Sequence, residues 1–350
     1  MITGKHVLVT GGTGSLGKVL IRRLLSDPAL RPASVTVFSR DEAKQEALRQ
    51  TMQRASLDGS WGSSGGTPDP LRFRIGSVTD PVALGAALRR AEVVINAAAL
   101  KQVPNCEYHP IEAVRTNIDG AANIVRLIAE QRIPVETVVG VSTDKACQPV
   151  NVMGMTKALQ ERIFIQGNLE VPGTRFVVAR YGNVLASRGS VIPLFHEQIR
   201  RGGPLTLTTV AMTRFFMNLE QAVDTVLTAA EIARAGEIVI PRIPSAHVVD
   251  VARALIGDRD IEMKVIGVRP GEKIHESLVS FDEAARSVVS GSNIIIRPML
   301  PEFSAYDERV VWDGGEYSSA TDLLDEPAVL DLLVRNKLRI EDAPTFLEAG

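Results

Sequence analysis

This sequence has few cysteines, nearly balanced positive and negative charges, and no long apolar segment. Cys106 and Cys147 are its only two cysteines, so no disulfide framework is available, and neither has a histidine at metal-ligand spacing. The net charge is −2, which excludes a general attraction to nucleic acid or to an anionic membrane. No apolar run approaches the roughly 18 residues that a membrane span requires, and the N-terminus lacks the layout of a signal peptide. We therefore predict a cytoplasmic protein with no metal site, no nucleic-acid partner and no membrane span.

The first half of the chain alternates short apolar runs with longer amphipathic stretches. The apolar runs predict strands at 6–10, 35–38, 71–75, 93–97, 135–141 and 175–180. The stretches between them predict helices at about 14–26, 42–54, 80–90, 107–131 and 152–168. Strands and helices that alternate in this way require parallel pairing with right-handed crossovers. We therefore predict an α/β fold with a doubly wound parallel sheet of the Rossmann type.

The pattern changes at about Asn183, beyond which proline and glycine punctuate short segments. A chain of 350 residues exceeds the usual size of a single core, so one large or two coupled domains are expected. We predict a Rossmann domain at 1–183 that binds the cofactor and carries the catalytic residues. A smaller α+β domain at 184–350 is predicted to bind the substrate at the carboxyl edge of the sheet. The chain can cross back from this domain to the first one. Segment 326–338 predicts a closing helix, and the Gly- and Ser-rich stretch 57–70 predicts a surface loop.

A glycine-rich segment, VLVTGGTGSLG, coincides with the end of the first predicted strand. Gly11, Gly14 and Gly17 suit a tight turn, a close approach of the backbone to a pyrophosphate, and close packing of a helix on a strand. The N-terminus of the next helix supplies free N–H groups and a positive dipole end for phosphates. The alternative is a glycine-rich turn without a ligand. We prefer a dinucleotide site, which also includes three residues of the same loop: Thr13, Ser15 and Leu16.

The end of the second predicted strand bears on the choice between NADP and NAD. NAD sites place a carboxylate about 20 residues beyond the glycines, where it holds the ribose 2′-hydroxyl. This sequence offers Ser39, Arg40 and the nearby Lys44, which suit a 2′-phosphate. Asp41 is the competing feature, because it could turn toward the ribose or simply start a solvated helix. We predict NADP.

The fifth predicted strand leads into the segment VSTDKACQPVNVMGMTKALQE, where short-chain dehydrogenases carry a hydroxyl residue and then Tyr-x-x-x-Lys. Lys157 is present here, but the tyrosine position is Met153, which can neither accept nor donate a proton. Either the redox chemistry is lost, or another group handles the proton. The sequence Thr143-Asp144-Lys145 offers an acid and an amine that a partly dry cleft can tune for acid and base work. The alternative is that Asp144 and Lys145 form a solvated turn.

Taken together, these motifs resemble a known family. The matching segments run from residue 10 to about 276: TGGTGSLG, FSRDEAKQ, NAAALKQVPNCEYHPIEAVRTNIDG, STDKACQPVNVMGMTK, RYGNVLASRGSVIPLF, MTRFFM and RPGEKIHE. The chain is similar to the NADP-dependent UDP-N-acetylglucosamine 4,6-dehydratases of the bacterial polysaccharide-biosynthesis group, a branch of the extended short-chain dehydrogenases. The lysine after Thr-Asp, with AALK and MTRF, is specific to this family.

The resemblance implies a mechanism. NADP⁺ would take hydride from carbon 4 of the sugar and later return it to carbon 6, so the cofactor ends as it began. Lys157 would orient the nicotinamide ribose and Thr143 would touch the 4-hydroxyl. Lys145, if neutral, would remove the proton on carbon 5, and Asp144, if protonated, would help the carbon-6 hydroxyl leave as water. In inverting members the proton returns on the opposite face of carbon 5.

The resemblance also implies the binding residues and the assembly. A UDP-hexosamine would be held by Asn183, Arg214, Arg269 and Glu272, with Lys101 near the sugar. Two arginines suit a diphosphate through bidentate contacts, although each could instead form a surface ion pair. Further cofactor contacts are expected from Ala97, Ala98, Ala99 and Asn117. A homo-oligomer, a hexamer or a dimer, is expected.

The sequence departs from the family pattern at three places. Met153 replaces tyrosine, Ser77 stands where an aspartate near the adenine is usual, and TTVAMTRF lacks the usual Asp-Pro before Met-Thr-Arg. Two alternatives to the dehydratase therefore stay open. One is a UDP-sugar 4-epimerase, which needs only removal and return of hydride. The other is a catalytically silent NADP-binding protein, which the replacement of the usual tyrosine by Met153 suggests.

Overall fold

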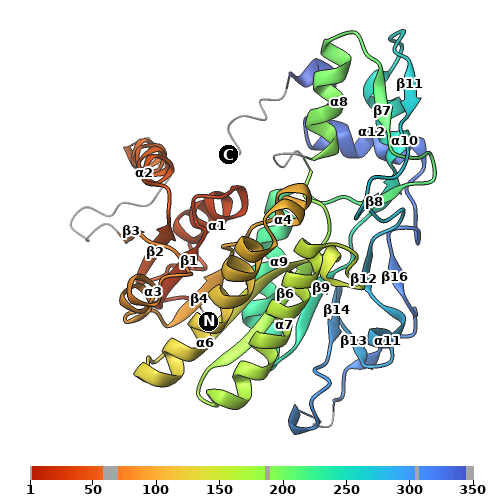
Figure 1. Cartoon of the computed structure of the whole chain (residues 1–350). Helices are drawn as coiled ribbons and strands as arrows, with labels where there is room; N and C mark the ends of the chain where they lie inside the picture. The colour runs from red at the N-terminus through yellow and green to blue at the C-terminus, as the bar shows by residue number, and fades with distance from the viewer. Residues whose placement is uncertain (1, 58–69, 186–189, 304–306, 344–350) are drawn as a thin grey trace.

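The computed structural model describes residues 2–57, 70–185, 190–303 and 307–343. Within these ranges a sheet of ten strands crosses the molecule in the order β15-β13-β14-β9-β6-β5-β4-β1-β2-β3 (Figure 1). Its parallel strands are β1 (His6–Thr10), β2 (Ser34–Ser39), β3 (Leu71–Ile75), β4 (Val93–Asn96), β5 (Thr137–Thr143), β6 (Arg175–Tyr181) and β9 (Ile238–Pro241). Antiparallel strands extend one edge: β13 (Ser287–Ser290), β14 (Asn293–Ile296) and β15 (Val310–Val311). The predicted Rossmann-type α/β fold is confirmed.

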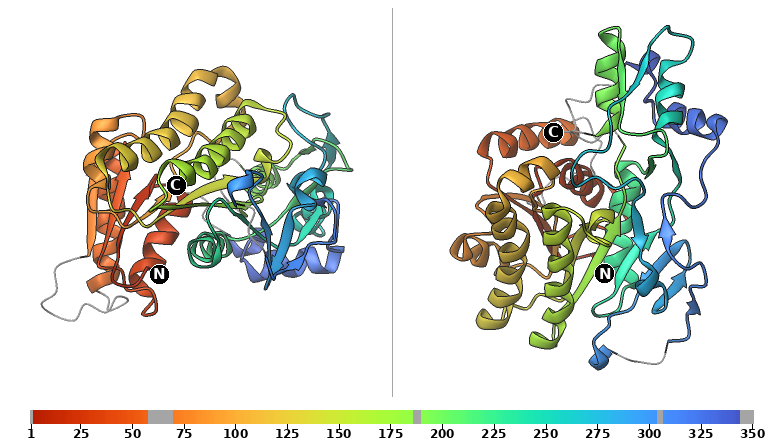
Figure 2. Two further views of the ribbon diagram at one scale, coloured as in Figure 1. Left: turned by 90° about the horizontal axis from the view of Figure 1, so that it is seen from below. Right: turned by 45° about the vertical axis from the view of Figure 1, so that its right-hand side comes forward.

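Helices cover both faces of this sheet, as Figure 2 shows from below. On one face α6 (Gly120–Gln131) packs between α3 (Pro81–Leu88) and α7 (Val152–Glu170). On the other face α1 (Ser15–Ser26) packs against α9 (Leu219–Ile232), and α2 (Glu42–Leu57) follows β2. Both layers bury their apolar stripes on strands that are themselves buried on both faces, as parallel sheets require.

The predicted continuous helix at 107–131 is wrong. The chain forms α4 (Val103–Tyr108), α5 (Pro110–Ala113), a π-helical turn (Val114–Asp119) and then α6. His109 has φ −130° and ψ 59°, outside the helical region, because the ring of Pro110 disfavours a helical residue before it. The break matters for the site, since the π-helical turn contains Asn117.

A second apolar cluster lies beyond the carboxyl end of the parallel strands, at the upper right of Figure 1. Its helices are α8 (Val191–Arg200), α10 (Val248–Ile256) and α12 (Glu326–Arg335), and α12 confirms the predicted closing helix. The small strands around it are β7 (Leu205–Leu207), β8 (Thr213–Phe215), β10 (Ser245–His247) and β11 (Met263–Val265). The remaining elements are β12 (Ser277–Val279), which pairs antiparallel with β16 (Tyr317–Ser318), and α11 (Phe281–Ala284), which lies beside β13 in Figure 1.

The chain crosses between the two clusters more than once, because α9, β9 and β13 to β15 rejoin the large sheet. The predicted division at residue 183 stays a prediction. The predicted surface loop at 57–70 lies, apart from its end residues, outside the described residues. None of the helices in the described ranges is long and apolar enough to span a bilayer.

Candidate active site

A cleft of about 1150 Å³ opens at the carboxyl ends of β1, β4, β5 and β6, between the two apolar clusters. This is the edge at which open α/β sheets bind their ligands, because loops from adjacent parallel strands meet there. Every site residue predicted from the sequence lines this cleft except Asn117. Segments that are far apart in the sequence, from Gly11 to Glu272, thus contribute to one cleft.

The glycine loop between β1 and α1 is built for close backbone approach. Gly11 has φ +65°, and a Cβ there would lie 2.7 Å from the Ala98 nitrogen. A Cβ on Gly17 would lie 2.5 Å from Gly12 Cα, so glycine is required where α1 meets the loop. Gly14 caps α1 without a side-chain hydrogen bond, which leaves the first N–H groups of the helix for an anion. These residues fit a dinucleotide pyrophosphate.

At the end of β2 the structure shows how Asp41 is used. Its Oδ1 accepts a hydrogen bond from the Lys44 backbone N–H at 2.9 Å, which starts α2 and lowers the pKa of Asp41. Asp41 is thus engaged at the helix start, one of the two roles that the sequence left open. Ser39 Oγ accepts from Gln45 Nε2 at 3.0 Å, while Arg40 is exposed beside it in the cleft lining.

Asn117 lies behind the cleft wall and acts on the loop that follows β4. Its Oδ1 accepts from the Leu100 N–H at 2.9 Å, and its Nδ2 donates to the Leu100 carbonyl at 3.0 Å. Nδ2 also donates to Thr156 Oγ1 on α7 at 2.9 Å. The fully buried amide therefore fixes the loop that contains Ala97, Ala98 and Ala99 against α7.

The Thr143-Asp144-Lys145 segment ends β5 and forms a short 3-10 turn, Asp144–Ala146. Asp144 is fully buried, so a solvated turn does not describe this residue. Its Oδ1 accepts from Thr143 Oγ1 at 2.8 Å and from Lys145 Nζ at 3.0 Å. Its Oδ2 is buried with no hydrogen-bond partner among the described residues. The arrangement pairs an acid with an amine at the cleft floor.

Sequence reasoning missed Glu276, which lies on the other side of the Lys145 amine. Glu276 Oε1 is 3.6 Å from Lys145 Nζ, and Oε2 is 3.7 Å from Lys273 Nζ. Burial acts to lower the pKa of Lys145, but the carboxylates of Asp144 and Glu276 act more strongly, so this pKa lies above its ordinary value. The signal was available, because Glu276 closes the RPGEKIHE segment that the resemblance singled out.

Lys157 and Met153 lie one turn apart near the start of α7. Lys157 Nζ donates to the Val141 carbonyl and to Gln160 Oε1, both at 2.6 Å. Burial lowers the pKa of Lys157 to about 7. Met153 is buried in an apolar cluster with Cys106 and lines the cleft. The position of the missing tyrosine is therefore an apolar surface.

The residues predicted to hold UDP lie around the segment 269–276. Arg214 Nη1 donates to the carbonyls of Thr213 at 2.7 Å and Ile274 at 3.0 Å, and Nη2 donates to that of Lys273 at 2.9 Å. Arg214 therefore clamps the backbone of this segment as well as lining the cleft. Glu272 Oε2 accepts from Thr208 Oγ1 at 3.3 Å. Arg269, Asn183 and Lys101 complete the predicted set in the cleft lining.

Buried polar atoms without a partner gather in this cleft. Within the described ranges four such atoms belong to lining residues: Asp144 Oδ2, Asn183 Oδ1, Ser190 Oγ and Glu276 Oε2. A buried polar atom is costly unless it forms a hydrogen bond, and a polar ligand can supply one. The cleft is therefore suited to a polar substrate rather than an apolar one.

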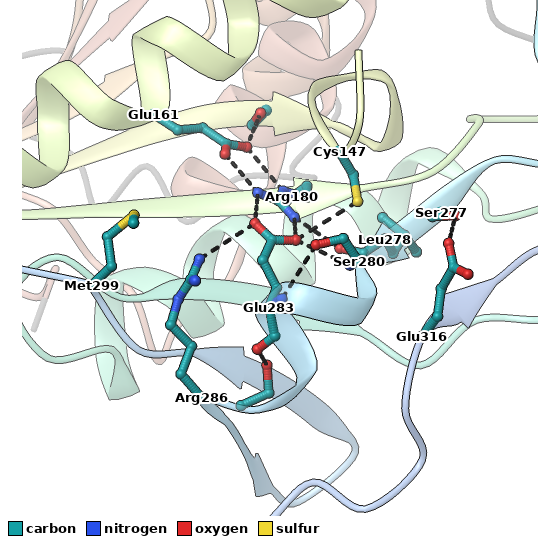
Figure 3. A network of polar contacts seen from close by, with 12 residues as sticks. Cys147, Glu161, Arg180, Ser277, Leu278, Ser280, Glu283, Arg286, Met299 and Glu316 are labelled. Carbon is teal, nitrogen blue, oxygen red and sulfur yellow. Dashed lines mark hydrogen bonds and ion pairs between the residues drawn. The ribbon is translucent and has the colours of Figure 1, made fainter.

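Next to the Asp144–Ala146 turn lies a second buried ionic group, which Figure 3 shows at close range. Arg180 on β6 donates to both carboxylate oxygens of Glu161 on α7, at 3.0 and 2.7 Å. It donates to both oxygens of Glu283 on α11 at 2.9 and 2.8 Å. Ser142 Oγ donates to Glu161 at 2.5 Å, so the group fixes the end of β5 from behind.

Comparison with known proteins identifies the family. A family model described as "Polysaccharide biosynthesis protein" matches residues 7–298. The chain belongs to this family. Within the polysaccharide biosynthesis protein family, the chain is 41% identical over 288 residues to a UDP-N-acetylglucosamine 4,6-dehydratase (inverting) of Campylobacter jejuni, covering 81% of this chain and 80% of that protein. The family resemblance read from the sequence is thereby confirmed.

Relatives in this family carry more than one activity in their names. The chain is also 41% identical over 292 residues to a UDP-glucose 4-epimerase of Rickettsia conorii, covering 82% of this chain and 81% of that protein. Among solved structures, Pen from Bacillus thuringiensis superposes with a TM-score of 0.85 at 31% identity, over 97% of this chain and 99% of that chain. Similarity at this level fixes the architecture, whereas the choice between the two activities depends on the site.

Proposed function

We propose that this protein is a UDP-N-acetylglucosamine 4,6-dehydratase that uses NADP. The observation that carries the proposal is the buried Asp144 carboxylate paired with Lys145 at the carboxyl end of β5. Hydride transfer at carbon 4 needs one group that takes the hydroxyl proton, but not an acid and a base together. Loss of water from a keto sugar needs a base for the proton beside the carbonyl and an acid for the departing hydroxyl. Relatives named as dehydratases support the same conclusion.

A nicotinamide dinucleotide fits the end of the cleft formed by the glycine loop. When bound, it would supply reversible hydride transfer to and from the sugar. Gly11, Gly14 and Gly17 let the backbone approach the pyrophosphate. Arg40 and Lys44 support NADP over NAD, since the competing carboxylate of Asp41 is bound to the start of α2.

The proton chemistry follows from the Asp144–Lys145 pair. Lys145 is an ammonium in the ligand-free protein, because its pKa lies above the ordinary value. Transfer of one proton from Nζ to Oδ1, across 3.0 Å, converts the pair into a neutral amine and a carboxylic acid. That form has the base and the acid that elimination requires. Thr143 Oγ1, which donates to the same oxygen, is placed to meet a sugar hydroxyl.

The substrate end of the cleft supports a nucleotide diphosphate. Arg214 and Arg269 both line it, and Glu272 and Lys101 lie on the same wall. Guanidinium groups suit diphosphates because their planar donors match phosphate oxygens. The buried Asn183 Oδ1 offers an acceptor that a uracil or sugar donor can meet.

A UDP-sugar 4-epimerase is the second candidate, favoured by relatives of that name at the same identity. Epimerisation at carbon 4 removes and returns one hydride, and it breaks no carbon–oxygen bond at carbon 6. Asp144→Asn should therefore spare an epimerase and abolish a dehydratase. The catalytically silent binder is disfavoured by the buried acid and amine, which a protein without chemistry does not need.

The deciding experiment is proton NMR of UDP-N-acetylglucosamine with purified protein in deuterated water, without added reductant. A new methyl signal from carbon 6, with deuterium at carbon 5, establishes dehydration, and its coupling constants report the stereochemistry at carbon 5. A change in configuration at carbon 4 without a methyl signal establishes the epimerase. An unchanged sugar, with bound NADP shown separately, contradicts both. The predicted homo-oligomer and cytoplasmic location stay predictions.

A further inference from the structure

Glu276 lies where the segment 269–276 meets the catalytic turn. Its backbone is held at both ends by Ser319: the Glu276 N–H donates to Ser319 Oγ at 2.9 Å, and the Ser319 N–H donates to the Glu276 carbonyl at 2.7 Å. Ser319 is fully buried and also bonds Thr213. The carboxylate is therefore presented to the cleft from a fixed backbone.

The side chain of Glu276 contacts two cations and lacks a full set of hydrogen bonds. It is only 4% exposed, and its Oε2 has no hydrogen-bond partner within the described residues. Lys145 and Lys273 approach its two oxygens at 3.6 and 3.7 Å. A buried carboxylate held without close hydrogen bonds is costly, so a purely structural role would be expected to satisfy it better.

Lys273 ties this carboxylate back to the catalytic turn. Its Nζ donates to the Cys147 carbonyl at 2.6 Å, one residue beyond the turn that contains Lys145. Arg214 meanwhile fixes the Lys273 and Ile274 carbonyls. The position of Glu276 relative to Lys145 is therefore determined from both sides, by the turn and by the segment.

We propose that Glu276 is a positioning residue of this active site, which holds the Lys145 amine beside Asp144 and sets its strength as a base. The proposal rests on the proposed function, because it assigns Glu276 a part in the proton transfer of that reaction. Glu276 acts through Lys145. It leaves the binding of the nucleotide to other residues.

The charges around Lys145 fix the sign of the expected effect. Asp144 in its own turn and Glu276 before β12 raise the pKa of Lys145, whereas Arg214 on β8 lowers it. Lys273 faces Glu276 from the same segment, and α7 contributes Lys157 to the cleft. Replacing Glu276 by glutamine removes one of the two carboxylates, so the titration midpoint of Lys145 should fall by about one pH unit.

The first measurement is independent of turnover. Lys145 is labelled with a trace of acetic anhydride across a pH series, and its acetylation is quantified by mass spectrometry. In Glu276→Gln the midpoint should fall by about one pH unit relative to the unchanged protein. Glu316→Gln is the matched control, since Glu316 is exposed and bonds Ser277 next in sequence to Glu276. The control should keep the original midpoint.

The second measurement is the pH profile of turnover of UDP-N-acetylglucosamine. In Glu276→Gln the basic limb of kcat/KM, where the Asp144–Lys145 pair loses its shared proton, should move to lower pH by the same amount, with kcat at the plateau about tenfold lower and KM unchanged. Glu276→Asp keeps the charge and should keep the limb near its original pH while kcat falls. This conservative variant also serves if the glutamine variant does not fold.

The outcomes separate the two proposals. An unmoved Lys145 midpoint in Glu276→Gln, in folded protein, overturns the role of Glu276 whether or not the enzyme turns over. A moved midpoint in a protein that forms no product from UDP-N-acetylglucosamine supports the coupling of Glu276 to Lys145 and contradicts the proposed function. An equal change of limb in the Glu316 control overturns the assignment, because a general change of charge would then explain it.

Discussion

Two buried ionic groups lie back to back at the end of β5, and they are built on opposite principles. Around Arg180 every carboxylate oxygen of Glu161 and Glu283 accepts a hydrogen bond from the guanidinium. Around Lys145 the carboxylates of Asp144 and Glu276 each keep one buried oxygen without a hydrogen-bond partner in the described ranges. The carboxylates around Arg180 therefore have hydrogen bonds to all their oxygens, whereas those around Lys145 keep two buried oxygens to which a ligand can donate.

We infer that the group around Arg180 stabilises the fold, whereas the group around Lys145 serves the proposed reaction. A buried ion pair contributes little net stability, but removing one partner strands the other and is strongly destabilising. An open carboxylate, by contrast, is already costly, so replacing it removes function while relieving a penalty. The saturated group therefore serves as the fixed wall against which the open group is held.

The largest expected effect is on turnover. Asp144→Asn keeps the shape of the side chain but cannot become an acid, so kcat should fall about 10²- to 10⁴-fold. The free energy of unfolding should change by less than about 1 kcal/mol, because the asparagine oxygen can still accept from Thr143 and Lys145 and the other oxygen of Asp144 has no hydrogen bond to lose. Steady-state kinetics and urea unfolding measure the two quantities, with exposed Asp282→Asn as the control. A loss of stability as large as the loss of activity would break the comparison.

Arg180→Met should show the reverse. The substitution leaves Glu161 and Glu283 buried without their cation, so the free energy of unfolding should fall by about 3–5 kcal/mol. Arg115→Met is the matched control, because Arg115 forms an exposed ion pair with Glu112 and should cost about 1 kcal/mol or less. Urea denaturation at neutral pH gives both values. Unchanged stability in Arg180→Met would show that the saturated group is not structural.

The fold could be read from the sequence because periodicity is local. Each of the first six strands appears as an apolar run, and parallel strands bring their carboxyl ends together whatever the details. That geometry alone gathers Gly11, Thr143 and Asn183 at one edge. The helix at 107–131 could not be read in the same way, because its apolar pattern continues through the break that Pro110 imposes.

Glu276 and the ionic group around Arg180 could not be predicted from local sequence patterns. The role of Glu276 depends on its contact with Lys145, and that of Arg180 depends on its hydrogen bonds to Glu283. In both pairs the partners are more than 100 residues apart in the sequence. A single sequence carries no signal for such a pairing beyond the residue types. The direction of the pKa shift of Lys145 could not be predicted for the same reason, since it depends on Glu276 as well as on the neighbouring Asp144.

The pH dependence of stability sharpens the comparison further. Burial acts to raise the pKa of Glu283, but Arg180 outweighs it and holds this pKa at about 2. Because the folded pKa lies below the ordinary value of 4.5, the stabilisation is complete above about pH 4.5 and is lost as the pH falls toward 2. About 2 kcal/mol of this stabilisation should be lost between pH 6 and pH 3. Urea unfolding between pH 6 and pH 3 measures it.

The variant Glu283→Gln isolates this contribution. Its unfolding free energy should start lower at pH 6 and change less on acidification than that of the unchanged protein. Exposed Glu231→Gln should follow the unchanged protein throughout. Parallel curves for Glu283→Gln and the unchanged protein would contradict the assignment of the lowered pKa to Glu283.

The smallest effect is expected at Lys273, which belongs to the group around Lys145 through its ion pair with Glu276. Lys273→Met removes one hydrogen bond to the Cys147 carbonyl and one ion pair with Glu276, so the free energy of unfolding should fall by only about 1 kcal/mol. Exposed Lys264→Met is the control and should change it less. Thermal and urea unfolding measure both. If Lys273→Met instead destabilises as much as Arg180→Met, the two groups form one cooperative unit, because the Cys147 residue that Lys273 holds also contacts Glu283.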